Sequence, residues 1–437
     1  MKQLLIIIFI LIAGGAKGYT KDFDYSHITP HPRLLLKEGE ERNIHMVLQK
    51  NTVLQAFHKR ILDYCDETLK EPPVKRIKEG KRLLGVSRIV LKRVFYLSYA
   101  YRMTSEEKYL RRAEKEMLAA ASFTDWNPSH FLDVSEMSMG LAIGYDWLFN
   151  ELLPDSRKKI RQAIVEKAIE ASKTKHASFY KSRTNWNQVC NGGLVCSALA
   201  IYEDEPEKTK EIINKALQTV PLALECYAPD GGYPEGFGYW SYGTSYQVML
   251  NDALESSLGH DAGLSDYPGF LQSAQYIQYM TAPTGDCFNF SDASPKAYGN
   301  IMMFWFAHKT KNPSLLWLEK KYLNDANLEF GEYLEERFLP CLLIFASRID
   351  LDEVTSPKGN TWHSRGKNPV YIYRSGWNSK TDTYLGVKGG TASTSHAHMD
   401  AGSFIYEQAG VRWAMDLGMQ THATQQQKHV ITEKDVF

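Results

Sequence analysis

The hydrophobic period of this chain changes once along its length, and that change limits the folds it can adopt. From about residue 34 to 346, apolar residues recur at i, i+3, i+4 and i+7, which is typical of amphipathic helices. From about residue 370 to 415 they alternate with period two, which is typical of half-buried strands. Because the helices precede the strands instead of alternating with them, the sequence predicts a large α domain followed by a β part.

The helical region divides into segments of ordinary length joined by short connections. We predict helices at 85–103, 106–121, 133–151, 155–173, 188–203 and 206–228. Short connections predict that successive helices are antiparallel neighbours. The run from Met137 to Ile143 is apolar on nearly all sides, so a helix there should be covered on several sides, as in the inner layer of a double ring of helices.

The pattern breaks between 347 and 362, and glycine-rich turns then separate the predicted strands 370–374, 383–387, 403–406 and 411–415. We therefore predict a helical toroid over 19–350 and the start of an antiparallel β-sandwich over 351–437. So few strands are close to the minimum for a stable sheet, and the last would be an open edge. The sandwich is accordingly predicted to be truncated, unless packing on the helices completes it.

The first residues predict export of the protein. A short basic start precedes the apolar run Leu4–Ala13 and a group of small residues, which is the pattern of a secretory signal peptide spanning 1–18. We therefore expect a secreted or periplasmic protein with no membrane segment after cleavage. The 51 Lys+Arg balance the 51 Asp+Glu, so nothing indicates a nucleic-acid partner. The six cysteines form no CxxC pair, which argues against a disulfide framework.

A first polar cluster lies at the start of an apolar helix. It reads Asn185-Trp186-Asn187-Gln188 and follows Arg183. In one interpretation an asparagine simply caps the helix. In the other, the amides donate to a substrate carboxylate, which the helix N-terminus and the arginine would also favour.

A second cluster, 230–244, is rich in glycine and aromatic residues and is predicted to form a loop before a helix. Exposed rings there would stack on a ligand, whereas buried rings would only fill the toroid. A tyrosine hydroxyl could also exchange a proton with a substrate. The candidate residues in and just after this segment are Glu235, Tyr239, Trp240, Tyr242 and Tyr246.

A third cluster places His396, His398 and Asp400 on one face of an extended segment. Histidine is the natural general base near neutral pH and also a common metal ligand. Together with Asp416 and His429, His398 would make a site of two histidines and a carboxylate suited to a structural Zn²⁺ or another divalent metal. Plain hydrogen bonding between these groups is the alternative. No organic cofactor is indicated.

Taken in order, these motifs resemble those of the heparinase II/III-like polysaccharide lyases and the related oligoalginate lyases. The resemblance covers nearly all of the chain after residue 18. It includes His-Pro-Arg-Leu-Leu at 31–35, the asparagine motif at 185–193, the Glu-Gly-x-Gly-Tyr-Trp-x-Tyr-Gly motif at 235–243, and the histidine motif at 396–404 followed by Asp-x-Gly. It implies a fold that is mainly α with a C-terminal β part: an incomplete (α/α) toroid on an antiparallel β-sandwich, with the active site between them. It also implies β-elimination on a uronate-containing polysaccharide.

The resemblance also assigns roles to residues. Tyr242 matches the catalytic acid, which often serves as base too, and His396 matches a base for the opposite C5 epimer. Asn185 and Asn187 match the groups that neutralise the uronate carboxylate, although many members have a histidine in this motif. The metal ligands would be His398, Asp416 and His429, and the further candidate substrate contacts are Arg183, Trp186, Gln188, Glu235, Tyr239, Trp240, Tyr246 and Arg374.

Two other functions fit the same residues. A glycoside hydrolase on a helical toroid would use two carboxylates, with candidates Asp230, Glu235, Asp286 and Asp292. A non-catalytic protein would bind the glycan without changing it. The expected partner is in each case a polysaccharide or oligosaccharide, acidic for the lyase. The sequence leaves open the polymer (heparin or heparan sulfate, or alginate), the exo or endo mode and the oligomeric state.

Overall fold

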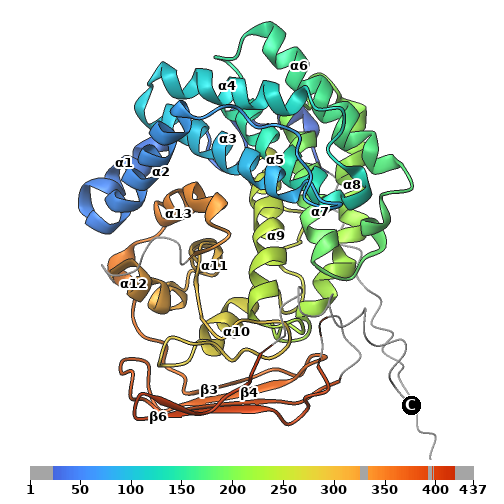
Figure 1. Cartoon of the computed structure of the whole chain (residues 1–437). Helices are drawn as coiled ribbons and strands as arrows, with labels where there is room; N and C mark the ends of the chain where they lie inside the picture. Colours follow the sequence, from blue (N-terminus) through green and yellow to red (C-terminus); the bar gives the residue numbers. More distant parts are fainter. Residues whose placement is uncertain (1–22, 325–332, 392–395, 397, 419–437) are drawn as a thin grey trace, which may run out of the picture.

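The computed structural model describes residues 23–324, 333–391, 396 and 398–418. The predicted signal peptide and the predicted metal ligand His429 lie outside these residues. Figure 1 shows a large helical part and a small sheet at one end of it. The helices are α1 (Glu41–Lys50), α2 (Thr52–Lys70), α3 (Leu84–Thr104), α4 (Glu107–Ala121), α5 (Phe131–Trp147), α6 (Pro154–Ile164), α7 (Asn185–Ala200), α8 (Pro206–Leu224), α9 (Phe237–Leu258), α10 (Ser273–Met280), α11 (Met302–Thr310), α12 (Trp317–Asn324) and α13 (Leu339–Ala346).

Helices α3, α5, α7 and α9 form the inner layer of the toroid. Helices α4, α6 and α8 alternate with them along the chain. Helix α5 packs on α3 and α7, and α7 packs on α9. All of α5 is buried, which confirms the prediction of an inner helix. The inner helices run parallel: Arg88 contacts Glu136 near the starts of α3 and α5, and Leu91 approaches Gly140 further along both. Their N-terminal ends therefore lie at the same end of the toroid.

Glycine allows these helices to approach each other closely. A Cβ atom on Gly193 of α7 would lie 2.5 Å from the Ser135 carbonyl oxygen of α5. A Cβ atom on Gly140 of α5 would lie 2.8 Å from the Cα atom of Leu91 on α3. Both distances are shorter than any ordinary carbon contact, so these two positions have to lack a side chain. The glycine of the asparagine motif thus serves helix packing.

Several helix ends differ from the prediction by up to four residues, and two differences are larger. The predicted helix 155–173 is interrupted, because α6 ends at Ile164 and a π-helical turn, Val165–Ile169, follows. The Glu170 amide then donates to the Val165 carbonyl, five residues back. Between α10 and α11 the chain is largely irregular, so the region from 34 to 346 is less uniformly helical than its periodicity predicts.

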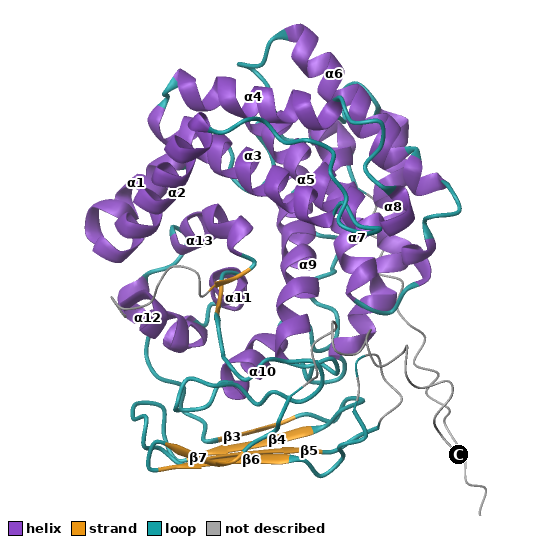
Figure 2. Ribbon diagram, in the orientation of Figure 1, coloured by secondary structure: helices purple, strands orange, loops and turns teal. Residues whose placement is uncertain are grey.

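The strands form one antiparallel sheet in sequence order, as Figure 2 shows. They are β3 (Thr361–His363), β4 (Val370–Arg374), β5 (Tyr384–Lys388), β6 (Phe404–Gln408) and β7 (Val411–Ala414). One face packs on the helical part: Ile372 and Ile405 are buried, and the Tyr384 hydroxyl donates to the Tyr279 carbonyl at 2.9 Å. The other face exposes aromatic side chains, including Tyr371 and Phe404.

The predicted boundary at 350–351 falls between α13 and β3. A short parallel pair, β1 (Gly299–Asn300) and β2 (Tyr333–Leu334), lies within the helical part and had no sequence signal. Among the described residues, no helix has the length and apolar character needed to cross a membrane.

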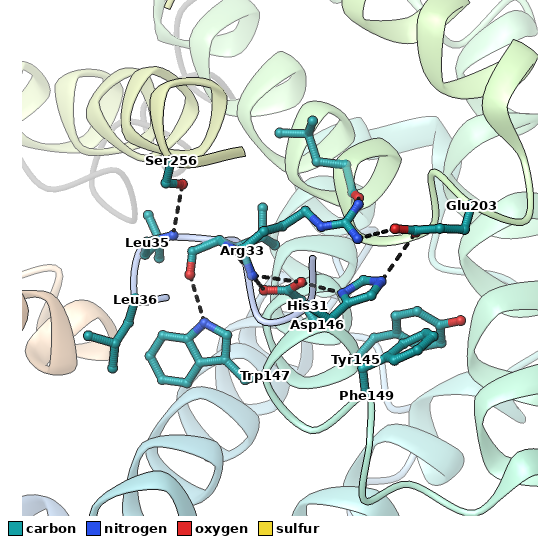
Figure 3. Close-up of polar contacts among 12 residues, drawn as sticks. His31, Arg33, Leu35, Leu36, Tyr145, Asp146, Trp147, Phe149, Glu203 and Ser256 are labelled. Atoms are coloured by element: carbon teal, nitrogen blue, oxygen red, sulfur yellow. Dashed lines mark hydrogen bonds and ion pairs between the residues drawn. The ribbon is translucent and has the colours of Figure 1, made fainter. Parts of the chain in front are cut away.

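The His-Pro-Arg-Leu-Leu motif forms a buried polar network at the C-terminal end of α5 (Figure 3). His31 Nδ1 lies 2.6 Å from Asp146 Oδ1, and His31 Nε2 lies 3.2 Å from Glu203. The backbone amides of Arg33 and Leu34 both donate to Asp146 Oδ2, at 2.9 and 2.8 Å. The motif therefore fastens the N-terminal segment to the far end of α5, and its role is structural.

Candidate active site

The N-terminal turns of the parallel inner helices bring together several of the polar residues. Helix α3 contributes Arg88, α5 contributes Glu136, α7 begins at Asn185, and α9 contributes Tyr242. Because the first amides of a helix lack partners within the helix, this end of the toroid carries partial positive charge. The arrangement favours an anionic ligand, provided that side chains there can hold it.

Glu136 is the centre of this cluster and is fully buried. Arg337 Nε lies 2.7 Å from its Oε2, and Arg337 Nη2 lies 2.8 Å from its Oε1. Arg88 Nε donates to Oε1 at 3.0 Å, and the Tyr242 hydroxyl donates to the same oxygen at 3.1 Å. Although burial would raise it, the two guanidinium groups hold the pKa of Glu136 below its usual value. Glu136 is therefore an ionised carboxylate that accepts a hydrogen bond from Tyr242.

Tyr242 is half-buried and carries a proton in this arrangement. Burial raises the pKa of its hydroxyl well above 10, and the charge of Glu136 adds to this effect, whereas Arg88 and Arg337 oppose it. The guanidinium carbons of Arg88 and Arg337 lie 5.2 and 5.7 Å from the centre of its ring. A neutral phenol held by a carboxylate is suited to donate a proton. These features fit the acid role that the resemblance implies.

The residues of the asparagine motif are buried, including Asn185 at 6% exposure, except for the half-buried Trp186. Asn187 is fully buried: its amide donates to the carbonyls of Ser182 and Thr219, at 3.0 and 2.9 Å. Gln188 is buried as well and donates to the Tyr227 hydroxyl. Both amides are therefore committed to the protein, which contradicts their prediction as substrate contacts.

Asn185 is the amide of this motif that remains available. Within the residues that the structure describes, its side chain has no hydrogen-bond partner. A Cβ atom on Gly243, the residue after Tyr242, would lie 3.0 Å from Asn185 Cβ, so the first turn of α7 packs closely against α9 there. Trp186 is half-buried with its ring edge-on to that of His130, and the exposed Arg183 pairs with Glu225.

The aromatic segment is mostly helix, which corrects the prediction of a loop. Helix α9 begins at Phe237, directly after Gly236, whose φ of +88° favours glycine. Trp240 and Tyr246 are fully buried, so the core interpretation holds for these two rings, and Glu235 is nearly buried. Tyr239 and Tyr242 remain half-buried on one face of α9.

His396 comes from the β part and lies against this face of α9. Its ring stacks on that of Tyr239, with centroids 4.1 Å apart and planes inclined by 24°. Its Nδ1 lies 2.5 Å from Asp292 Oδ2, and His398 Nε2 lies 3.1 Å from Asp292 Oδ1. Asp292 therefore fixes one nitrogen of His396, and among the described residues the other nitrogen has no hydrogen-bond partner. Burial raises the pKa of Tyr239 to about 12, and the charge of Asp292 contributes to this shift.

The predicted metal ligands do not converge in the part of the chain that is described, where no three candidate ligands form a cluster. His398 faces Asp292, whereas Asp416 Oδ1 accepts from the Gly418 amide. The third ligand, His429, lies outside the described residues. The zinc site stays a prediction, and no step of the reaction proposed below uses a metal.

Arg374 and the carboxylates of the hydrolase alternative occupy other environments. Arg374 is buried under the sheet, where its guanidinium carbon lies 3.5 Å from the centre of a Trp377 ring, so it cannot meet a substrate there. Burial lowers its pKa to about 10. Asp230 pairs with Arg365, and Asp292 with the two histidines. Asp286 is half-buried, and its backbone pairs with that of Lys296.

Sequence reasoning missed four residues of the site: Arg88, Glu136, Arg337 and the pairing role of Asp292. Glu136 carried a usable signal, because an acidic residue directly precedes the apolar run that begins at Met137. A carboxylate inside a helix that is buried all round requires a cation or several hydrogen-bond donors as partners. The identity of these partners had no local signal.

Comparisons with known proteins support the fold. No protein-family model matches the chain, and neither does any curated protein. Among solved structures, a mutant of the heparan sulfate lyase HepC from Pedobacter heparinus superposes with a TM-score of 0.51 at 16% identity, covering 82% of this chain and 53% of that one. A structure of heparinase III gives 0.48 at 14% identity over 80% of this chain and 52% of the other.

A second heparinase III, the BT4657 gene product, gives a TM-score of 0.45 at 15% identity, covering 94% of this chain and 61% of that one. The chain therefore spans between half and two thirds of the length of these structures. The first of the three superpositions, together with the order of helices before an antiparallel sheet, shows that this chain has the fold of the heparinase-like polysaccharide lyases.

Proposed function

We propose that the protein is an exported polysaccharide lyase that cleaves a uronate-containing glycan by β-elimination. The observation that carries this proposal is that His396 stacks on Tyr239, on the face of α9 that also carries Tyr242. Tyr239, which stacks on His396, lies three residues before Tyr242. That spacing corresponds to about one helical turn, or ~4.5 Å along the axis. A proton donor and a histidine thus lie on the same side of α9, about one helical turn apart.

β-Elimination makes three demands. The uronate carboxylate must be neutralised, so that the proton on C5 becomes acidic. A base must take that proton while the C4–O4 bond breaks and a C4=C5 double bond forms. An acid must then protonate the departing O4. We assign the base to His396, which Asp292 orients, and the acid to Tyr242, whose raised pKa keeps it protonated. The Asn185 amide can donate to the carboxylate.

The polymer is a heparin or heparan sulfate type or an alginate type of glycan. The names of the similar solved structures make heparan sulfate the first polymer to test. The hydrolase alternative has less support, because Asp230 and Asp292 are engaged in ion pairs with Arg365 and the two histidines. The alternative of a non-catalytic binding protein does not account for the hydrogen bond that Tyr242 donates to Glu136.

The test is to incubate the protein with a panel of uronate polymers and to follow the ultraviolet absorbance of the unsaturated product. We expect Tyr242→Phe to lower turnover by at least ~100-fold, since a positioned acid contributes about that much. Tyr276→Phe is the matched control, because it alters a fully buried tyrosine of α10 whose ring packs on Trp362, and it should retain most of the turnover. Undiminished turnover in Tyr242→Phe would exclude this residue as the acid.

Export is a separate part of the proposal. If residues 1–18 are a signal peptide, then protein recovered from the periplasm or the medium should begin at Tyr19. N-terminal sequencing of the recovered protein tests this directly, and a mature protein that still begins at Met1 would contradict it.

A further inference from the structure

We propose that Arg88 binds the carboxylate of the uronate that undergoes elimination, with Glu136 as its positioning residue. This inference rests on the proposed lyase function and adds a substrate contact to it. The need for such a contact is clear from the asparagine motif. Asn187 and Gln188 are committed to the protein, which leaves Asn185, a neutral amide, to face a charged group.

Arg88 lies beside the proposed acid and is available to a ligand. Its guanidinium carbon lies 5.2 Å from the centre of the Tyr242 ring, and its side chain is 40% exposed. Its Nε donates to Glu136 at 3.0 Å. Within the described part of the chain, its two terminal nitrogens have no hydrogen-bond partner. Arg88 is thus held at one nitrogen and presents the other two.

The neighbouring arginine shows the contrast. Arg337 uses Nε and Nη2 on Glu136 and Nη1 on Glu335, and its side chain is only 9% exposed. Arg337 thus bridges two carboxylates, Glu136 and Glu335, and all three of its nitrogens are committed to the protein. Arg337 therefore secures the buried charge, and Arg88 is the arginine of the pair that can meet a substrate.

The chemistry of the guanidinium group fits the task. Its terminal N–H groups are planar and match the two oxygens of a carboxylate, so that one arginine can bind it through two parallel hydrogen bonds. Charge withdrawn from the carboxylate at C6 makes the proton on the adjacent C5 more acidic. The position beside Tyr242 would place the neutralised carboxylate next to the acid that protonates O4. The charged groups facing Tyr242 are Glu136, Glu335, Arg88 and Arg337.

The first experiment compares Arg88→Gln with Arg111→Gln. Arg111 is the matched control, because it is also 40% exposed and ion-paired, but it lies on the outer helix α4. We expect kcat/KM on the cleaved polymer to fall by roughly 10- to 100-fold in Arg88→Gln, as for loss of a charge-assisted hydrogen bond. The control should match wild type. Arg88→Lys keeps the positive charge but not the planar pair of N–H donors, so it should recover part of the loss of kcat/KM. The melting temperature of each variant verifies that it is folded.

The second experiment separates a substrate contact from a purely structural role. In a Tyr242→Phe background, which prevents cleavage, binding is measured to the polymer and to the same polymer with its carboxyl groups reduced to alcohols. Carboxyl reduction should weaken binding to the protein with Arg88 by roughly 10-fold or more, and should matter much less in the Arg88→Gln variant.

An equal effect of carboxyl reduction in both proteins would overturn the assignment of Arg88, even if turnover falls. Unchanged kcat/KM in Arg88→Gln would overturn it as well. Failure of the proposed function looks different: wild type itself would then release no unsaturated product from any uronate polymer.

Discussion

Asp146 holds the N-terminal segment onto the end of α5, and its replacement by alanine tests the structural role given to the His-Pro-Arg-Leu-Leu motif. The carboxylate is fully buried and accepts from the His31 ring and from the backbone amides of Arg33 and Leu34. Asp146→Ala would leave these donors without their acceptor in a region that water does not reach. His31 would keep only its contact with Glu203.

The magnitude follows from the burial. Removing one partner of a buried ion pair costs about 3–5 kcal/mol, because the remaining groups stay buried and unpaired. At ~2.1 cal/mol/K per residue, a helical part of roughly 320 residues has an unfolding entropy of ~0.7 kcal/mol/K. A loss of about 4 kcal/mol therefore lowers the melting temperature of Asp146→Ala by about 6 °C.

Scanning calorimetry measures this shift, with Asp63→Ala as the control. Asp63 pairs with Lys59 at 2.6 Å on an exposed surface of α2, where such a pair contributes about 0.3–0.5 kcal/mol. The control should therefore shift the melting temperature by about 1 °C or less. A similar small shift for Asp146→Ala would refute the buried-pair reasoning. Lost turnover without lost stability would instead make the motif part of the active site.

Three further predictions follow from helix packing and from the polar network. Gly193→Ala should destabilise the protein by about 1–3 kcal/mol in chemical denaturation, because the new Cβ would lie 2.5 Å from the Ser135 carbonyl oxygen. Gly238→Ala, where a Cβ would meet nothing within 4 Å, should cause no loss, and equal effects would contradict the packing argument. Burial opposes the charge of His31, but its two carboxylate partners, Asp146 and Glu203, raise its pKa above 6.5. Burial also opposes the charge of Glu203, but hydrogen bonds from His31 and Arg33 lower its pKa from 4.5 to about 2. The stabilisation from charged His31 is complete below pH 6.5 and is lost as the pH rises through the pKa of His31 in the folded protein. The stabilisation from ionised Glu203 is complete above pH 4.5 and is lost as the pH falls toward 2. The difference in melting temperature between wild type and Glu203→Gln should therefore be largest between pH 4.5 and 6.5, and a difference that does not vary with pH would contradict the ionic role of the pair.

The elements of the fold were predictable where periodicity alone decides them. The inner helix around Met137 and the strand Val370–Arg374 both follow from their apolar patterns. The prediction of a loop over 230–244 was wrong for the first turns of α9, because the glycines at 236, 238 and 243 indicate a loop in the sequence. In the structure, Gly243 lies where α7 and α9 approach closely, so packing between helices outweighs the low helix propensity of glycine.

The site was predictable only where its residues lie close together in the sequence. Tyr242 and the histidines belong to short motifs, and the resemblance identified them. Glu136 and Arg337 are 201 residues apart, and Asp292 is 104 residues from His396. No local pattern encodes such pairs, because they form only when the toroid closes and the sheet packs against it. The prediction of Trp240 and Tyr246 as substrate contacts was wrong for a related reason. Which face of α9 is covered depends on α7 and α11, which pack against it, and not on the sequence of α9 itself.

Helix α5 shows how structure and function can be separated among its buried charges. Its three carboxylates, Asp133, Glu136 and Asp146, are all fully buried, and each has found donors. Asp133 accepts from the Leu83 amide and also contacts the side chains of Asn127 and His130, and Asp146 accepts from amides of the N-terminal segment, so both hold segments of backbone.

Glu136 differs because, within the described residues, all of its partners are side chains and none is a backbone amide; two of them, Arg88 and Tyr242, are partly exposed. A buried carboxylate in an apolar helix therefore indicates that it holds other groups in place. The kind and exposure of these groups indicate whether the carboxylate stabilises the fold or positions residues for a ligand. By this criterion we expect the proposed ligand to bind at the Glu136 end of α5, opposite the end that Asp146 fastens.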